Sequence, residues 1–180
     1  MTALNCIIRN VIGPDSSWFW TMIQAIFISV SAVLIYFQLK AQNFGTMLGT
    51  IATLDERWAA EEMFKARKTL CSKYGENDLT IDDQIGRVLD FFEQMGLYLK
   101  KRAFTEDVIW EFHSYTIKYY WAIAEPLIKE IRSSTKDQTY YEWFEWLKTK
   151  MMEEDKRRGL PKTVPTKEEI TKFISGEECK

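Results

Sequence analysis

The sequence predicts an all-α protein, with one N-terminal transmembrane helix followed by a small helical-bundle domain. Three observations lead to this fold class. Residues 1–54 hold only three charged side chains, whereas residues 55–180 hold the other 47 of the chain's 50. Within the first part, residues 18–39 form a run of 22 residues without any charge. In the second part, apolar residues recur at steps of three and four, and no stretch alternates as a β-strand does.

The apolar run at 18–39 is long enough to cross a membrane. At about 1.5 Å per residue, a helix of this length reaches roughly 33 Å, and the hydrocarbon layer is about 30 Å thick. Trp18 and Trp20 stand near one end and Tyr36 and Lys40 near the other, as is typical of residues at a membrane interface. The alternatives are a cleaved signal peptide and a buried core helix. Against them, the run continues past the small residues that a signal peptidase accepts, and it is apolar on every face.

The flanks of this run indicate its orientation weakly. Lysine and arginine are slightly more numerous after the run than before it, and Cys71 and Cys179 show no disulfide pattern. We therefore expect a single-pass protein of the cell (inner) membrane, with its C-terminal domain in the cytoplasm.

We divide the chain into five segments by composition. In order, they are an N-terminal segment (1–17), the transmembrane helix (18–39), a juxtamembrane helical stalk (40–54), a helical domain (55–152), and a charged, proline-containing tail with a short helix (153–180).

Capping residues place the helices of the domain. The first helix continues over residues 55–73, and each later helix begins after a residue that can accept a hydrogen bond from its first turn. The predicted caps and terminators are Gly75, Asp78 or Thr80, Thr105, Thr139 with Glu142, and Thr166 with Glu169. We expect the stretch at 153–166 to be a boundary beyond which the chain docks loosely or not at all.

Helical periodicity also predicts the core. The residues that we expect to be largely buried in one cluster are Phe92, Ile109, Phe112, Tyr119, Trp121, Trp143 and Leu147. Arg67 and Arg132 each lie on an apolar-patterned helix, so we expect at least one of them to pair with a carboxylate, with Glu93 or Asp90 as the leading partners. Two solvated arginines are the alternative.

Small residues recur every four positions in the stalk. They are Ala41, Gly45, Gly49 and Thr53. On a helix they form a ridge where another helix can approach closely. We expect the membrane helix to continue to about Ala52 and to pack there against another copy or a partner subunit. The alternatives are a new helix capped by Thr53 and a hinge loosened by the glycines.

A second candidate surface lies in the domain. Lys100, Lys101 and Arg102 are adjacent and basic, and the aromatic run near residue 143 leaves Trp146 or Tyr141 for a partner or for the membrane interface. Contact with anionic lipid headgroups is the functional interpretation of the basic residues. The alternative is a solvated loop.

The sequence carries no recognisable catalytic, cofactor-binding or metal-binding motif. We expect the single histidine, His113, to be partly buried beside helix aromatics, and a catalytic dyad with Cys71 has no local signature. A net charge of −2 and a pI near 5.6 argue against nucleic-acid binding. The expected partners are therefore membrane lipid and either a second protein or a second copy of the chain.

The runs at 81–132 and 140–151 resemble the bacterial domain-of-unknown-function family 4760. The matching features are FFE-x-x-G at Phe91, Phe92, Glu93 and Gly96, an aromatic stretch ending at Trp121, Arg132, and a late F-E-W-L. The resemblance implies an N-terminal membrane helix followed by a helical domain, and it supplies no catalytic residue. Residues 100–103 replace a break that often contains glycine in the family.

Together these features predict a membrane-anchored helical interaction module, a subunit or adaptor of a larger membrane-associated complex. A membrane-tethered enzyme with an unrecognised active site is the alternative.

Overall fold

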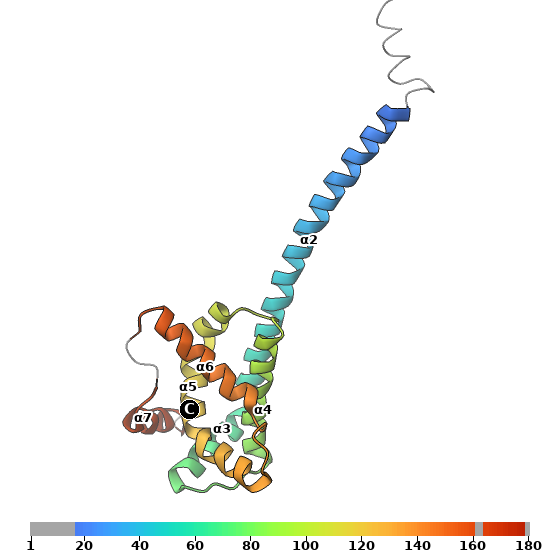
Figure 1. Cartoon of the computed structure of the whole chain (residues 1–180). Helices are drawn as coiled ribbons and strands as arrows, with labels where there is room; N and C mark the ends of the chain where they lie inside the picture. The colour runs from blue at the N-terminus through green and yellow to red at the C-terminus, as the bar shows by residue number, and fades with distance from the viewer. Residues whose placement is uncertain (1–16, 161–163, 179–180) are drawn as a thin grey trace, which may run out of the picture. The chain divides into compact units, whose positions relative to one another are not determined.

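The computed structural model describes residues 17–160 and 164–178. In these ranges the only regular secondary structure is α-helix, which confirms the all-α fold class. The helices are α2 (Ser17–Ala59), α3 (Glu61–Glu76), α4 (Asp83–Lys100), α5 (Glu106–Thr135), α6 (Glu142–Arg157) and α7 (Lys167–Glu178) (Figure 1). The chain divides into two compact units between Leu48 and Gly49.

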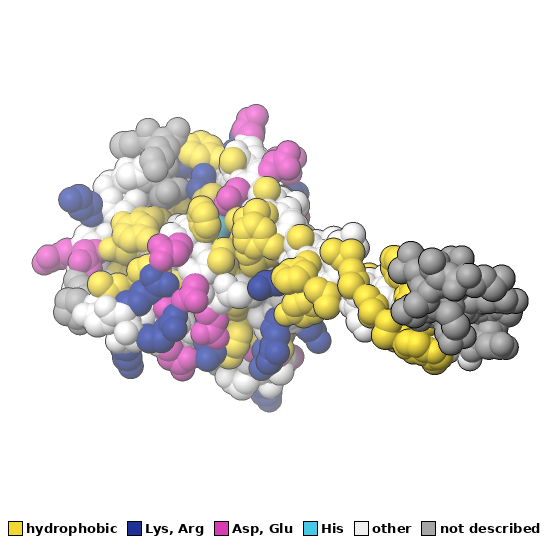
Figure 2. Space-filling model, turned by 90° about the horizontal axis from the view of Figure 1, so that it is seen from above, with side chains coloured by type: hydrophobic (Ala, Val, Ile, Leu, Met, Phe, Trp, Pro, Cys, Tyr) yellow, Lys and Arg dark blue, Asp and Glu magenta, His cyan; other side chains and the backbone are white. Residues whose placement is uncertain are grey.

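The first unit holds the apolar part of α2. Of the described helices, α2 alone is long and apolar enough to cross a membrane, and no residue of its most apolar 18-residue window is buried. Figure 2 shows hydrophobic side chains along this helix. The hydroxyl groups of Thr21 and Ser29 donate to the carbonyls of Ser17 and Ala25, each at 2.8 Å, so these polar groups are satisfied within the helix.

The helix runs further than the sequence predicted. α2 continues through Ala52 to Ala59, and the Thr53 hydroxyl donates to the Gly49 carbonyl at 2.9 Å instead of capping a new helix. The break comes at Ala60, whose extended backbone (ψ 143°) separates α2 from α3. The predicted continuous helix over 55–73 is therefore wrong at this one residue.

The second unit packs an aromatic core around the C-terminal end of α2. Ile51 and Leu54 are buried there, and the ring of Trp58 lies 4.9 Å from that of Phe91 and 5.2 Å from that of Tyr120. Most of the remaining core comes from the inner faces of the other helices. Its fully buried large side chains include Phe91, Phe92, Leu70, Ile85, Leu89, Met95, Ile109, Ile117, Tyr120, Ile123 and Phe144.

One predicted core residue is misplaced. Phe112 is 64% exposed, whereas its neighbour His113 is only 7% exposed. The buried stripe of α5 runs through Ile109, His113 and Ile117 at steps of four, and Phe112 is rotated by about 100° from that stripe. Tyr119 and Trp143 are half-buried, and the other predicted core residues are buried as expected.

Several helix ends also differ from the predictions. α3 ends with Asn77 in the left-handed conformation (φ 56°), not at Gly75. α4 is capped by Asp82, whose carboxylate accepts from the backbone N–H groups of Gln84 and Ile85 at 3.0 Å, and not by Asp78 or Thr80. In each case a later residue provides the cap, so the loop between α3 and α4 lies further along the chain than the sequence indicated.

The N-terminus of α6 is held by α4. The predicted capping box of Thr139 with Glu142 does not form; instead, the backbone N–H of Phe144 donates to the carboxylate of Glu93 at 2.8 Å. Burial raises the pKa of Glu93, and the N–H groups of Phe144 and Trp143 oppose that rise. A Cβ on Gly96 would lie 2.2 Å from the Trp143 carbonyl oxygen, so glycine permits this close approach.

The C-terminal segment docks on the domain, contrary to the prediction. Helix α6 extends to Arg157, and the Thr166 with Glu169 capping box forms at the start of α7. Ile170 is buried, and the ring of Phe173 lies 4.9 Å from that of Tyr119. These apolar contacts hold α7 against α3 and α5.

Candidate functional site

The helices bring two basic clusters of the sequence, a first at residues 100–102 and a second at residues 156–158, to one end of the domain. Asp55 of α2 lies 3.3 Å from His113 of α5, and Trp58 lies beside Tyr120 further on, so these helices run in the same direction. The start of α5, and with it the loop at 101–105, therefore lies where α2 enters the domain.

The same end receives the C-terminus of α6. Trp121 contacts Phe144 and Trp110 contacts Asp155, so α5 and α6 are antiparallel. Arg157 and Arg158 consequently lie beside the first turns of α5.

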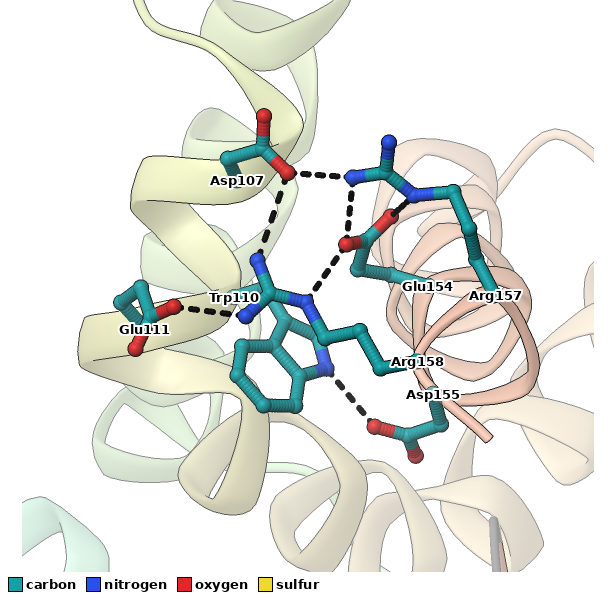
Figure 3. Close-up of polar contacts among 7 residues, drawn as sticks. All are labelled: Asp107, Trp110, Glu111, Glu154, Asp155, Arg157 and Arg158. Carbon is teal, nitrogen blue, oxygen red and sulfur yellow. Dashed lines mark hydrogen bonds and ion pairs between the residues drawn. The ribbon is translucent and has the colours of Figure 1, made fainter. Parts of the chain in front are cut away.

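The arginines of this second cluster are neutralised within the domain (Figure 3). Glu154, which is 4% exposed, accepts hydrogen bonds from Arg157 and Arg158 at 2.6 Å. Arg157 also bonds Asp107, and Arg158 bonds Glu111 at 2.6 Å. Hydrogen bonds from the two arginines lower the pKa of Glu154 to about 2, so the carboxylate stays ionised at neutral pH.

A buried pair continues this network inward. Asp155 is fully buried; its carboxylate accepts from the Trp110 indole N–H at 2.7 Å and from the Lys118 ammonium at 2.6 Å. The guanidinium of Arg158 lies 3.8 Å from the centre of the Trp110 ring and covers it (Figure 3). Because every charge here has a partner, the network's evident role is to fasten α6 to α5. The sequence offered no signal for it, since Lys118 and Asp155 are far apart along the chain.

The first basic cluster is different, because it borders an open groove of about 630 Å³. The groove is lined by Leu99, Lys100, Arg102, Phe104, Thr105, Glu106, Trp146 and Lys150. The ammonium groups of Lys100 and Lys150 lie 5.4 Å and 5.8 Å from the centre of the Trp146 ring. The structure therefore brings Lys100, Arg102 and Trp146 together around one groove, with Lys150 beside them.

The backbone of this basic loop is well defined. The N–H of Ala103 donates to the Tyr98 carbonyl and that of Arg102 to the Leu99 carbonyl, each at 3.0 Å, which is the hydrogen-bond pattern of a Schellman motif. Arg102 occupies the left-handed position (φ 60°) that glycine usually takes. Arg102 thus forms the turn without a glycine, at some cost in backbone energy.

Tyr141 is not among the residues that line this groove. It is the left-handed residue before α6 (φ 57°), and burial, with the carboxylates of Asp90 and Glu93, raises the pKa of its hydroxyl to about 12. It therefore lies beside the middle of α4, whereas Lys100 and Trp146 lie at that helix's C-terminal end.

A second groove of about 590 Å³ lies between α5 and α7. It is lined by Trp58, Arg67, Tyr115, Thr116, Tyr119, Glu169, Lys172, Phe173 and Gly176. The guanidinium of Arg67 lies 4.5 Å from the centre of the Trp58 ring. Arg132 is ion-paired as expected, but with Glu145 at 2.7 Å and not with Glu93 or Asp90.

The remaining candidates do not form a catalytic cluster in the described residues. His113 faces Asp55, and burial lowers the pKa of its imidazole. Cys71 is fully buried on α3. In the described part of the chain, no group of three or more His, Cys, Asp or Glu side chains is placed to hold a metal ion.

Comparison with known proteins agrees with the helical plan. The family model described as a domain of unknown function (DUF4760) matches residues 25–151, well over half of the chain. The chain belongs to the DUF4760 family. No curated protein and no solved structure matches it. The DUF4760 match extends from within the apolar part of α2 to Met151 of α6, and so includes both the apolar helix and the groove beside Lys100.

The residues that carried the DUF4760 resemblance have structural roles in this chain. Phe92 stacks on Phe144 with ring centres 4.6 Å apart, Glu93 caps α6, and Gly96 admits the Trp143 backbone. The FFE-x-x-G motif therefore builds the contact between α4 and α6.

Proposed function

We propose that this protein is a single-pass, membrane-anchored helical interaction module, a subunit or adaptor of a larger membrane-associated complex. The observation that carries the proposal is that the apolar part of α2 exposes large apolar side chains on all of its sides. The exposed large side chains there are Met22, Ile26, Phe27, Ile28, Val30, Val33, Leu34, Ile35, Phe37 and Leu39.

The energetic cost of this exposure supports a membrane anchor. Burying one such side chain contributes roughly 1.5–3 kcal/mol. Taken together, these side chains represent on the order of 10 kcal/mol or more, which is comparable to the whole stability of a typical domain. A hydrocarbon layer removes this cost without requiring any further protein.

The stalk supports an interaction role. A Cβ placed on Gly45 or on Gly49 meets no atom within 4 Å, so this side of the helix is open to another chain. Each glycine costs a helix roughly 1 kcal/mol relative to alanine, and close packing of a second helix on the ridge of Ala41, Gly45, Gly49 and Thr53 would offset that cost.

Washing of native membranes tests the anchor. The full chain should remain in the membrane fraction through alkaline carbonate and high salt, whereas Ile28→Lys with Leu34→Lys should release it or prevent insertion. As a matched control, Leu160→Lys with Val164→Lys makes the same change at exposed positions of the domain and should leave insertion intact. Release of the unaltered protein by carbonate would refute the anchor.

The orientation and the interaction need separate measurements. A reporter fused after Lys180 should behave as cytoplasmic, and activity of a periplasmic reporter there would reverse the proposed orientation. Gly45→Leu with Gly49→Leu should reduce cross-linking to a second copy or to a co-purifying subunit. The control Gln42→Leu with Thr46→Leu places the same two leucine side chains beside the ridge, and an equal effect of both pairs would refute the ridge as an interface.

A further inference from the structure

We propose that the basic loop of Lys100, Lys101 and Arg102, together with Trp146, binds the anionic headgroups of the membrane that holds α2. This inference rests on the membrane anchor proposed above. It names the surface of the domain that contacts lipid and the lipid chemistry that it recognises.

Chain connectivity places this loop near the membrane. The loop lies at the end of the domain where α2 enters, as the contacts of Asp55 with His113 and of Trp58 with Tyr120 establish. Only eleven residues lie between Leu39, the end of the apolar run, and Ile51, the first buried residue of the domain. This short tether keeps the loop close to the headgroups at a high local concentration. Figure 2 views the domain from this end and shows dark blue side chains in more than one group there.

The two basic clusters at this end differ in how their charge is balanced. Arg157 and Arg158 are bonded to Glu154, Asp107 and Glu111. In contrast, among the described side chains (residues 17–160 and 164–176), no carboxylate forms an ion pair with Lys100, Lys101 or Arg102. The cluster at Arg157 and Arg158 is satisfied internally, whereas the cluster at Lys100, Lys101 and Arg102 is available to an external anion.

The side chains beside the loop suit a membrane interface. Trp146 is half-buried, and the ammonium groups of Lys100 and Lys150 lie 5.4 Å and 5.8 Å from the centre of its ring. An indole flanked by lysines is a combination that favours the headgroup layer, where the ring is partly dehydrated and the charges meet phosphate. The Schellman motif orders the backbone of the loop, so the three cations project from a fixed turn.

The opposite end of α4 carries the opposite charge. Asp78, Asp82 and Asp83 lie at the start of the helix, and the basic loop follows its end. Lys73 balances part of the acidic group, with its ammonium 3.1 Å from Asp82. The helix of 18 residues separates the two ends by roughly 27 Å. This asymmetry favours presentation of the basic end, rather than the acidic end, to an anionic surface.

Lysine acylation of the reconstituted full chain tests the inference. The chain is placed in vesicles of phosphatidylcholine, with or without added phosphatidylglycerol, and labelled with a water-soluble acylating reagent. Each Lys or Arg near an anionic surface strengthens binding by roughly fivefold. We therefore expect labelling of Lys100 and Lys101 to slow at least fivefold in phosphatidylglycerol vesicles, and high salt to remove that protection. Equal labelling in both kinds of vesicle would overturn the inference and indicate that these charges only complement the dipole of α4.

A pair of glycine substitutions separates lipid contact from folding. Arg102→Gly removes one charge at a left-handed position, where glycine is favoured, so the fold is retained. Lys136→Gly makes the same change at the left-handed residue after α5 (φ 55°), at the other end of the domain. Arg102→Gly should reduce the protection of Lys100 and Lys101 severalfold, and Lys136→Gly should leave it unchanged. Equal effects of the two variants would overturn the proposal.

Two further outcomes are decisive. Carbonate washing of the same vesicles shows whether α2 has inserted. Extraction of the protein from both kinds of vesicle would refute the membrane anchor and this inference with it. Insertion of α2 without slower labelling of Lys100 and Lys101 would refute this inference alone. Protection of the lysines in native membranes but not in phosphatidylglycerol vesicles would identify an acidic protein as the partner and would likewise overturn lipid binding.

Discussion

Replacement of Gly96 by alanine should destabilise the domain, although alanine favours helices. A Cβ at this position of α4 would lie 2.2 Å from the carbonyl oxygen and 2.7 Å from the carbonyl carbon of Trp143. Both are backbone atoms, so no side-chain rotation relieves the clash and the start of α6 must move away from α4. That movement weakens the hydrogen bond of Phe144 N–H to Glu93 and the stacking of Phe92 on Phe144.

The same helix supplies a matched control. A Cβ on Gly86 meets nothing within 4 Å, so Gly86→Ala should express only the gain in helix propensity, about 0.5–1 kcal/mol. Overpacking typically costs about 1–3 kcal/mol, and the lost cap adds to that cost. The net loss for Gly96→Ala is therefore on the order of 1–3 kcal/mol. The same substitution, glycine to alanine, is thus predicted to stabilise the domain at position 86 and to destabilise it at position 96.

Thermal unfolding of the full chain in mild detergent measures both variants. Near-ultraviolet circular dichroism reports the packing of the aromatic core and is insensitive to the helicity of the apolar part of α2. For a domain of this size, 1 kcal/mol shifts Tm by roughly 3–5 °C. Gly96→Ala should lower Tm by roughly 4–12 °C, and Gly86→Ala should raise it by a few degrees. Equal stabilisation by the two substitutions would refute the close approach of α6 to Gly96.

Three other predictions concern the core and the polar network. Asp155→Asn leaves the Lys118 ammonium buried without its carboxylate and should lower the free energy of unfolding by about 3–5 kcal/mol. Asp155→Asn combined with Lys118→Met should lower it less. Additive losses of the two substitutions in chemical denaturation would refute the buried pair. Phe92→Ala should cost about 3–5 kcal/mol and the exposed Phe112→Ala less than about 1 kcal/mol, and equal losses of stability would contradict the assignment of the buried face of α5. The pKa of Glu154 is lowered to about 2 from its usual 4.5, so the contribution of this carboxylate to stability is present above pH 4.5 and is lost as pH falls toward 2. Glu154→Gln should therefore reduce the loss of stability between pH 4.5 and pH 2. Parallel curves of stability against pH for the two proteins would contradict the ion pairs.

Local patterns predicted the fold class and several of its elements. A charge-free run of 22 residues and apolar steps of three and four are properties of neighbouring residues, so they indicate helices without knowledge of the tertiary structure. The capping box of Thr166 with Glu169 formed as predicted, because both of its partners lie within one turn. The structure places Lys100, Arg102 and Trp146 around one groove, and a role of that groove in contact with a partner or a membrane stays a prediction.

Local patterns failed where a residue from another helix supplied the interaction. Thr139 has the spacing of a cap, yet α6 is capped by Glu93, which lies 51 positions before Phe144. Phe112 and His113 are equally plausible as inward residues of α5, and only the packing of α2 and α4 against that helix decided that His113 is buried.

The difference between what the sequence predicts and what the structure shows is clearest for the charged residues. The order of residues alone predicts an apolar helix, a charged helical domain and two short basic clusters. The folded structure shows in addition that Arg157 and Arg158 are neutralised by Asp107, Glu111 and Glu154, while Lys100 to Arg102 are not. The physical reason is that the balance of a charge depends on which carboxylates lie within a few ångströms, and here the antiparallel packing of α5 and α6 sets those distances.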